Sequence, residues 1–283
     1  MKAGQKINMK YLIIGAGGTG GVTGYYMKKA GKDVTLIARG EHLKKIQKQG
    51  LTLEKMWDKT EENISIPATD MEHYAEHPDV IFVCVKGYSL QETIPFIKRI
   101  ARKNTIVIPV LNIYGTGGKM QKELPDLLVT DGCIYVSANI KEPGKLLQHG
   151  QILHIVFGVR DKAEFRPELK EIQKDLCDSH IDGTYFFGKH PDRRKHSEKS
   201  FSLCIPDRGS RTHYHATAAD FQKEGEAREL FKTMVKEIAA LAEAMESFPE
   251  RYGRSNLKIL SKPRTGSNHF HAAGYHGRKT VRN

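Results

Sequence analysis

The feature that most constrains the fold is a glycine motif that directly follows a short apolar run near the start of the chain. The run Lys10–Ile14 has the length and composition of a buried parallel strand. The glycines after it have the spacing G-x-G-x-x-G and are Gly15, Gly17 and Gly20. Such a motif carries weight only when a strand precedes it and a helix follows it, so the next segment decides its meaning.

The residues after the motif supply that context. A helical pattern covers 22–30, and an apolar run over 34–37 predicts a second strand. Further buried strands are predicted at 79–85 and 105–110, with a helix capped by Ser89 between them. Strands that alternate with helices predict an α/β fold, here a Rossmann-type doubly wound sheet.

In such a fold the glycine turn is a dinucleotide site. Gly15 permits the tight turn, Gly17 lets a pyrophosphate approach the backbone, and Gly20 lets helix and strand pack closely. The helix N-terminus adds unpaired amides and a positive dipole end. The predicted cofactor-binding residues of the turn are Gly15, Ala16, Gly17, Gly18, Thr19 and Gly20. A methyl-donor nucleotide in a similar fold is the alternative.

Three polar residues follow predicted strands at the edge where ligands bind. An acidic residue after the second strand would favour NAD, but Arg39 stands there, and its forked charge suits a 2′-phosphate. NADPH/NADP is therefore the predicted cofactor. Lys86 could reach a cofactor phosphate or ribose, and Asn112 an amide or a substrate oxygen. The plainer alternatives are a solvated lysine and a turn-forming asparagine.

The next segment predicts the edge of the sheet. Strands are expected at 132–140 and 144–158, and a turn at His149-Gly150 predicts an antiparallel hairpin within the second of them. A helix is expected over 166–179, with Pro167 in its first turn. The scattered histidines are expected to be structural or surface residues; they are His149, His154 and His180.

The net charge of +12 comes from two segments without an apolar period. Residues 184–212 hold seven Lys/Arg and three acids, and residues 251–283 hold eight Lys/Arg and no acid, so the remainder is balanced. A basic-tailed nucleic-acid binder is one reading of such a chain, but no nucleic-acid partner is expected, since no folded face carries the excess. No apolar run could span a bilayer, and the four cysteines lack metal or disulfide spacing. We therefore expect a cytoplasmic protein without a metal.

These motifs together resemble the ketopantoate reductase (2-dehydropantoate 2-reductase) family. The resemblance rests on IIGAGGTGG, LIARG, VCVKGYS and VLNIYGTG in that order and covers about 9–183. It implies an NADP-binding Rossmann domain over 9–183 and a helical substrate and catalytic domain over 184–283. It further implies that Lys86 and Asn112 contact cofactor and substrate, and that Ala138 touches the cofactor. Dimerisation as a homodimer would be consistent with the family.

The resemblance also implies a general acid early in the second domain. Hydride delivered to a ketone carbon leaves an alkoxide, which a lysine ammonium can stabilise and protonate. Lys195 and Lys199 lie near the expected place, without the flanking pattern, and Lys199 is taken as the candidate. With Asn112 it completes the predicted catalytic set.

We hypothesise that 184–212 and 251–283 are frameshifted, which would leave the second domain incomplete. With codons chosen among those permitted, CIPDRGSRT read one base later gives VSPIGAAG, similar to the run that opens the family's catalytic helix region. A divergent loop and a disordered basic linker are the alternatives. Between the segments, Asp220 is expected to cap an amphipathic helix whose apolar positions are Phe221, Leu230, Met234, Ile238 and Leu241.

The sequence therefore predicts an NADPH-dependent oxidoreductase that reduces a 2-oxoacid, by resemblance 2-dehydropantoate to pantoate, a step towards pantothenate and coenzyme A. Reduction of another 2-oxoacid is one alternative. A non-catalytic NADP-binding protein is the other, because the catalytic motifs are missing from the sequence as written.

Overall fold

The computed structural model describes residues 9–113, 115–187 and 223–244. The chain divides into two compact units, Met1–Lys189 and His190–Asn283. Residues 188–222 and 245–283 lie outside the described residues, and they include most of the basic segment 184–212 and all of 251–283. Lys199 and Asp220 are among them. Within the described ranges, no helix is both long enough and apolar enough to cross a membrane.

The first unit is built on a parallel sheet, which confirms the predicted α/β fold class. Its strands pair in the order β5-β2-β1-β6-β7-β8, and every neighbouring pair is parallel. The chain thus adds β2 on one side of β1 and β6 on the other. The bounds are Lys10–Ile14 (β1), Asp33–Ile37 (β2), Ala68–Thr69 (β5), Val80–Val83 (β6), Ile106–Pro109 (β7) and Leu128–Val129 (β8).

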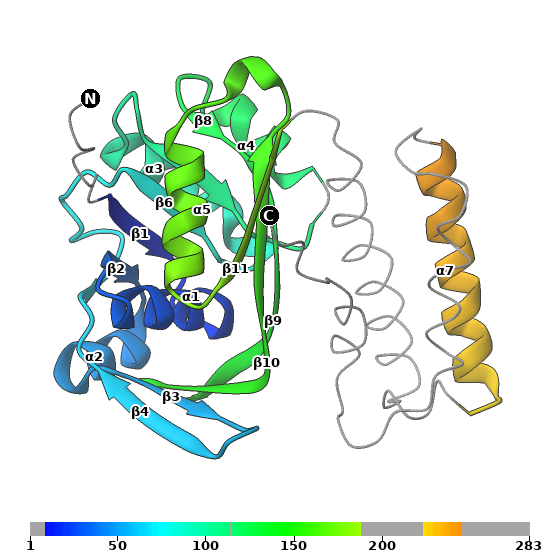
Figure 1. Ribbon diagram of the computed structural model, residues 1–283, viewed down its shortest axis with the longest axis horizontal. Helices are drawn as coiled ribbons and strands as arrows, with labels where there is room; N and C mark the ends of the chain where they lie inside the picture. The colour runs from blue at the N-terminus through cyan, green and yellow to red at the C-terminus, as the bar shows by residue number, and fades with distance from the viewer. Residues whose placement is uncertain (1–8, 114, 188–222, 245–283) are drawn as a thin grey trace, which may run out of the picture. The chain divides into compact units, whose positions relative to one another are not determined.

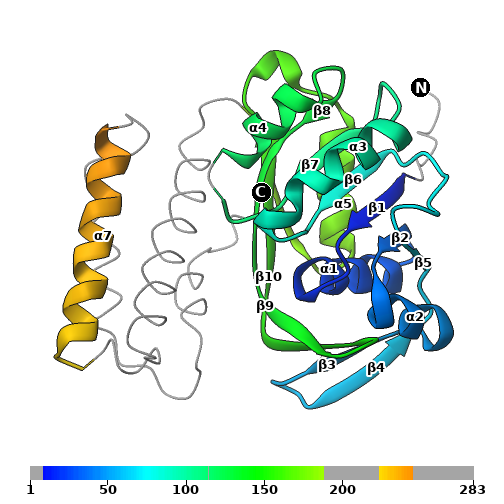
Figure 2. The same cartoon turned by 180° about the vertical axis from the view of Figure 1, so that it is seen from behind.

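Helices cover both faces of this sheet, as Figures 1 and 2 show from opposite sides. Alternate residues of each strand enter two separate cores: Tyr11 and Ile13 pack with the side of α1 and α5, and Leu12 and Ile14 with the side of α3 and α4. The helices are Gly18–Lys29 (α1), Gly40–Gln49 (α2), Leu90–Ile100 (α3), Thr116–Glu123 (α4) and Glu168–Asp178 (α5), with 3₁₀ turns at Gly87–Ser89 (η1) and Lys162–Glu164 (η2).

A second sheet packs beside α1. Its order is β11-β10-β3-β4, and β9 pairs with β10 off this path. β10 runs parallel to β3 and β11 and antiparallel to β9. The bounds are Leu51–Lys55 (β3), Thr60–Ile64 (β4), Asp131–Glu142 (β9), Lys145–Val159 (β10) and Asp182–Phe187 (β11).

Two predictions about these elements are wrong. The first helix begins at Gly18 rather than at 22, because the low helix propensity of glycine hides a helix start that lies inside the motif. The turn expected at His149-Gly150 is absent, since β10 continues through it with a register shift between Gln148 and Leu153. The hairpin turn lies instead before β10, where Gly144 has φ +80°.

Other differences concern element ends. Ser89 occupies the N-cap of α3, but its hydroxyl makes no capping hydrogen bond. β11 continues the sheet beyond Gly183 to Phe187. In the second unit the described helix is α7, Glu226–Ala244, which begins after a bend at Gly225 and buries Phe231 and Val235, where the expected positions Leu230 and Met234 are only partly buried.

Candidate functional site

The order of the sheet places a topological switch point at the carboxyl ends of β1 and β6. The chain leaves β1 for β2 on one side, while β6 lies on the other, so the connections diverge there. Ligands of open α/β sheets bind at such a switch point. The glycine turn follows β1, and Lys86 follows β6, so two predicted parts of the site meet at this edge.

The glycine turn is tight and closely packed underneath. Gly15 has φ +101°, a conformation that favours glycine, and its amide and that of Ala16 each donate to the Ile37 carbonyl oxygen at 3.0 Å. A Cβ on Gly20 would lie 2.2 Å from the Gly15 oxygen and 2.8 Å from Cys84 Cβ. Burial raises the pKa of the Cys84 thiol to about 12, so it is a packing group.

The outer side of the turn is open. Among the described residues, a Cβ on Gly17 would meet nothing within 4 Å. Gly17 is the N-cap of α1, and its amide donates to no acceptor within the described part of the chain. Unpaired amides at a helix N-terminus favour an anion. These residues therefore fit the diphosphate of a dinucleotide.

Ala138 also lies at the turn. It belongs to β9, where it pairs with Gln148, and a Cβ on Gly18 would come within 2.2 Å of its carbonyl oxygen. The β9 backbone thus closes one side of the α1 N-terminus. A contact between Ala138 and a cofactor stays a prediction.

Arg39 and Lys86 stand exposed at two strand ends. Arg39 is the N-cap of α2 directly after β2, and Lys86 precedes η1 after β6. Neither side chain forms an ion pair with any described residue. Two unpaired cations at the ligand edge of a sheet suit an anionic ligand.

Asn112 differs because its amide is already engaged. Its Nδ2 donates to the Ile134 carbonyl oxygen at 3.1 Å, and its Oδ1 accepts from the Ile134 amide at 3.3 Å. The side chain therefore joins the loop after β7 to β9. Its predicted contact with cofactor or substrate would have to replace or share these bonds, and it stays a prediction.

Sequence reasoning missed His42, which touches the turn from α2. Its Nε2 lies 2.9 Å from the Ala16 carbonyl oxygen, and the Gly144 amide donates to its Nδ1 at 3.0 Å. No local pattern predicts this contact, because Gly144 is remote in the sequence; the only local sign is that His42 follows Arg39 by three residues. The three histidines expected to be structural include His154, which is buried and pairs with Asp182 at 2.7 Å.

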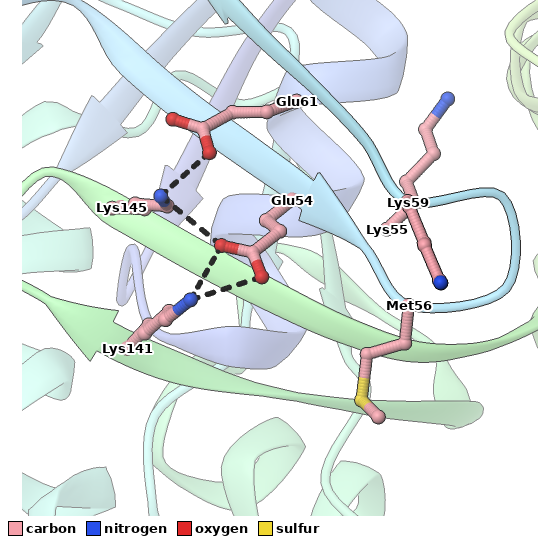
Figure 3. A pocket seen from close by; sticks show the side chains of 7 residues that line it. All are labelled: Glu54, Lys55, Met56, Lys59, Glu61, Lys141 and Lys145. Atoms are coloured by element: carbon pink, nitrogen blue, oxygen red, sulfur yellow. Dashed lines mark hydrogen bonds and ion pairs between the residues drawn. The ribbon is translucent and has the colours of Figure 1, made fainter.

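A separate polar hollow lies on the β3–β4 hairpin (Figure 3). Its volume is about 510 Å³, and its lining contains none of the predicted site residues. Glu54 accepts from Lys141 and Lys145, and Lys145 also pairs with Glu61 at 2.7 Å. These bonds lower the pKa of the Glu54 carboxyl and raise that of the Lys145 ammonium. Lys55, Met56 and Lys59 complete the lining.

Comparison with known proteins assigns a family to this architecture. The family model described as "Ketopantoate reductase PanE/ApbA" matches residues 11–162. A curated relative, the 2-dehydropantoate 2-reductase of Pyrococcus horikoshii, is 33% identical over 168 residues, which are 58% of this chain and 52% of the relative. The chain spans about half the length of the curated relatives that it matches first.

Solved structures share the fold at low identity. The 2-dehydropantoate 2-reductase of Porphyromonas gingivalis W83 has a TM-score of 0.77 at 22% identity, covering 89% of this chain and 88% of its own. A D-mandelate dehydrogenase solved with NADH and anilino(oxo)acetate has a TM-score of 0.78 at 19% identity, covering 93% and 84%.

Proposed function

The chain belongs to the ketopantoate reductase PanE/ApbA family, and from that premise we propose that it is an NADPH-dependent reductase of 2-dehydropantoate. The observation that carries the proposal is the glycine turn, where Gly17 is open and its amide has no acceptor among the described residues. A backbone donor that no described residue uses is available to an external acceptor.

Each exposed group then has a role that its position supports. The amides of the turn hold the cofactor diphosphate, and Gly17 leaves room for it. Arg39 binds the 2′-phosphate, because it stands after β2, where an acidic residue would instead select NAD. Lys86 binds a phosphate or ribose oxygen from the end of β6.

The proposed chemistry is reduction of the ketone of a 2-oxoacid. NADPH, when bound, supplies the hydride. The chain must then protonate the oxygen that gains negative charge, and a lysine ammonium is a suitable acid. Lys199 is the candidate, and it lies outside the described residues. Asn112 would orient the substrate or the cofactor from the loop after β7.

The first test measures NADPH binding and turnover on the full chain. NADPH fluorescence titration gives the Kd, and loss of nicotinamide absorbance with 2-dehydropantoate gives the rate. We expect tight NADPH binding, weaker NADH binding, and turnover that is fastest with 2-dehydropantoate among a panel of 2-oxoacids. Absence of NADPH binding would overturn the proposal, and preference for another 2-oxoacid would reassign its substrate.

A second candidate is a non-catalytic NADPH-binding protein. It is favoured by the missing catalytic motif around Lys195 and Lys199 in the sequence as written. It predicts NADPH binding without turnover of any 2-oxoacid. The coding DNA distinguishes the two: a frame one base later that encodes the family-like runs in 184–212 and 251–283 supports a reductase gene. Confirmation of the frame as written supports the binding protein.

A further inference from the structure

His42 joins the glycine turn to a segment that the sequence places far away. It lies in the first turn of α2, with its imidazole partly buried. Its Nε2 is 2.9 Å from the carbonyl oxygen of Ala16 in the turn. Its Nδ1 is 3.0 Å from the amide nitrogen of Gly144, between β9 and β10. One side chain therefore connects α2, the turn and the second sheet.

The two partners fix the protonation state of the ring. The Gly144 amide is a donor, so Nδ1 must accept and carries no proton. The Ala16 carbonyl is an acceptor, so Nε2 must carry the proton. Only the neutral Nε2–H tautomer makes both bonds. A proton added at Nδ1 would face the Gly144 N–H and break that bond.

The bond to Ala16 acts on Gly17 through the peptide plane. The carbonyl of Ala16 and the N–H of Gly17 belong to one planar unit, and described peptide bonds are all trans. The two groups therefore point in opposite directions. Holding the Ala16 oxygen on the His42 side turns the Gly17 N–H away from it, and this amide has no acceptor among the described residues.

We propose that His42 is a positioning residue of the nucleotide site, which orients the Gly17 amide by holding the Ala16 carbonyl, and which does so only as the neutral imidazole. This inference rests on the proposed binding of NADPH at the glycine turn. The start of α2 would then contribute two residues to the nucleotide site: Arg39, which binds the 2′-phosphate, and His42, which holds the glycine turn.

The charges near the ring leave its neutral form favoured. The charged residues at the start of α2 are Arg39 at the N-cap, Glu41 and Lys45. Glu41 pairs with Lys44. Glu142 and Lys145 flank the β9–β10 turn, and Lys145 is engaged by two glutamates. The glycine turn contributes none. Burial lowers the pKa of His42, against the opposing effect of the Ala16 hydrogen bond.

Three substitutions separate the two hydrogen bonds. His42→Gln keeps a donor near the Nε2 position for Ala16, His42→Asn keeps an acceptor near the Nδ1 position for Gly144, and His42→Leu removes both. We expect the Gln variant to bind NADPH within about twofold of wild type, and the Asn and Leu variants to bind about tenfold more weakly, the scale of one hydrogen bond. Equal affinity in all four chains would overturn the proposal.

A measurement without cofactor decides the role of His42 independently. Amide hydrogen exchange and ¹⁵N shifts of the turn are compared in the four chains. We expect the Ala16 amide to exchange faster and the Gly17 resonance to move in the Asn and Leu variants, and both to stay near wild type in the Gln variant. An unchanged turn in the Leu variant would overturn the proposal. Absence of NADPH binding by wild type would instead overturn the proposed function.

The pH dependence supplies a readout that a purely structural role would not give. Wild-type affinity for NADPH should fall as the pH drops through the pKa of His42, which burial holds below its ordinary value, because the ring then gains a proton. The 2′-phosphate titrates in the same range, so the Gln variant is the matched control that retains only that part. Identical pH profiles for wild type and the Gln variant would contradict the requirement for a neutral ring.

Discussion

The glycine turn and the charged hollow on the β3–β4 hairpin are both polar regions of the first unit, but they use their polar groups differently. The hollow is roomy, yet its two glutamates are bound by Lys141 and Lys145. In the turn the Gly17 amide has no acceptor among the described residues, and Gly17 is open. The difference teaches that a large hollow can have its charges already paired, while the turn keeps a backbone donor available for a ligand.

The largest effect should come from the packed side of the turn. In Gly20→Ala the new methyl would lie 2.2 Å from the Gly15 oxygen, a backbone atom that cannot move without distorting the turn. We expect a loss of about 3 kcal/mol in the free energy of unfolding, measured with urea. Gly118→Ala in α4 is the control: nothing lies within 4 Å, and the same change should gain about 0.5–1 kcal/mol. Equal effects would remove the distinction between packed and open glycines.

The next effect concerns the cation beside the turn. Arg39→Met keeps the length of an exposed side chain and removes its charge. NADPH binding should weaken by about 2 kcal/mol, the scale of hydrogen bonds to a charged group. NADH, which lacks the 2′-phosphate, should bind as before. Titration of both cofactors checks this, and an equal loss for the two would assign Arg39 to another part of the ligand.

A smaller effect is expected from acid. The pKa of His42 is lower in the folded chain than the ordinary 6.5, so below that pH the unfolded chain binds more protons than the folded one. Stability from His42 is therefore present above about pH 6.5 and is lost as the pH falls through the folded value. Urea unfolding of wild type minus His42→Gln, from neutral pH to pH 5, isolates this part. A flat difference would contradict it.

The smallest effect should come from the hollow. Lys145→Met removes its bonds to Glu54 and Glu61, which lie at the protein surface, where Glu61 is exposed and solvent screens the charges. We expect the unfolding midpoint and the NADPH affinity to stay within error of wild type. Loss of NADPH binding would show that the hollow, rather than the turn, belongs to the nucleotide site.

The sequence predicts an element of the fold well when the burial of that element leaves a clear apolar pattern. β1, β2, β6 and β7 are buried on both faces, so each appears as a continuous apolar run. β4 was missed because four of its five residues are exposed polar side chains, which leave no alternation. The turn at Gly144 was misplaced because Gly150, within a strand with shifted register, resembles a turn residue.

The site divides in the same way. Gly15, Gly17 and Gly20 were found because a backbone requirement leaves a local spacing. The engagement of Asn112 with Ile134 and of His42 with Gly144 was not visible, because each depends on β9 or β10 returning to the first sheet. Local sequence therefore predicts a glycine turn more easily than the side chains that hold the turn in shape.

The most direct test of the central claim is NADPH binding by Gly17→Ala, measured together with its unfolding free energy. The added methyl meets no atom of the described residues within 4 Å, so the fold should lose about 1 kcal/mol or less, the cost of alanine at an N-cap. It occupies the space through which a diphosphate would approach the amides, so NADPH affinity should fall at least about tenfold. A folded Gly17→Ala chain that binds NADPH as wild type does would show that the turn is not the cofactor site.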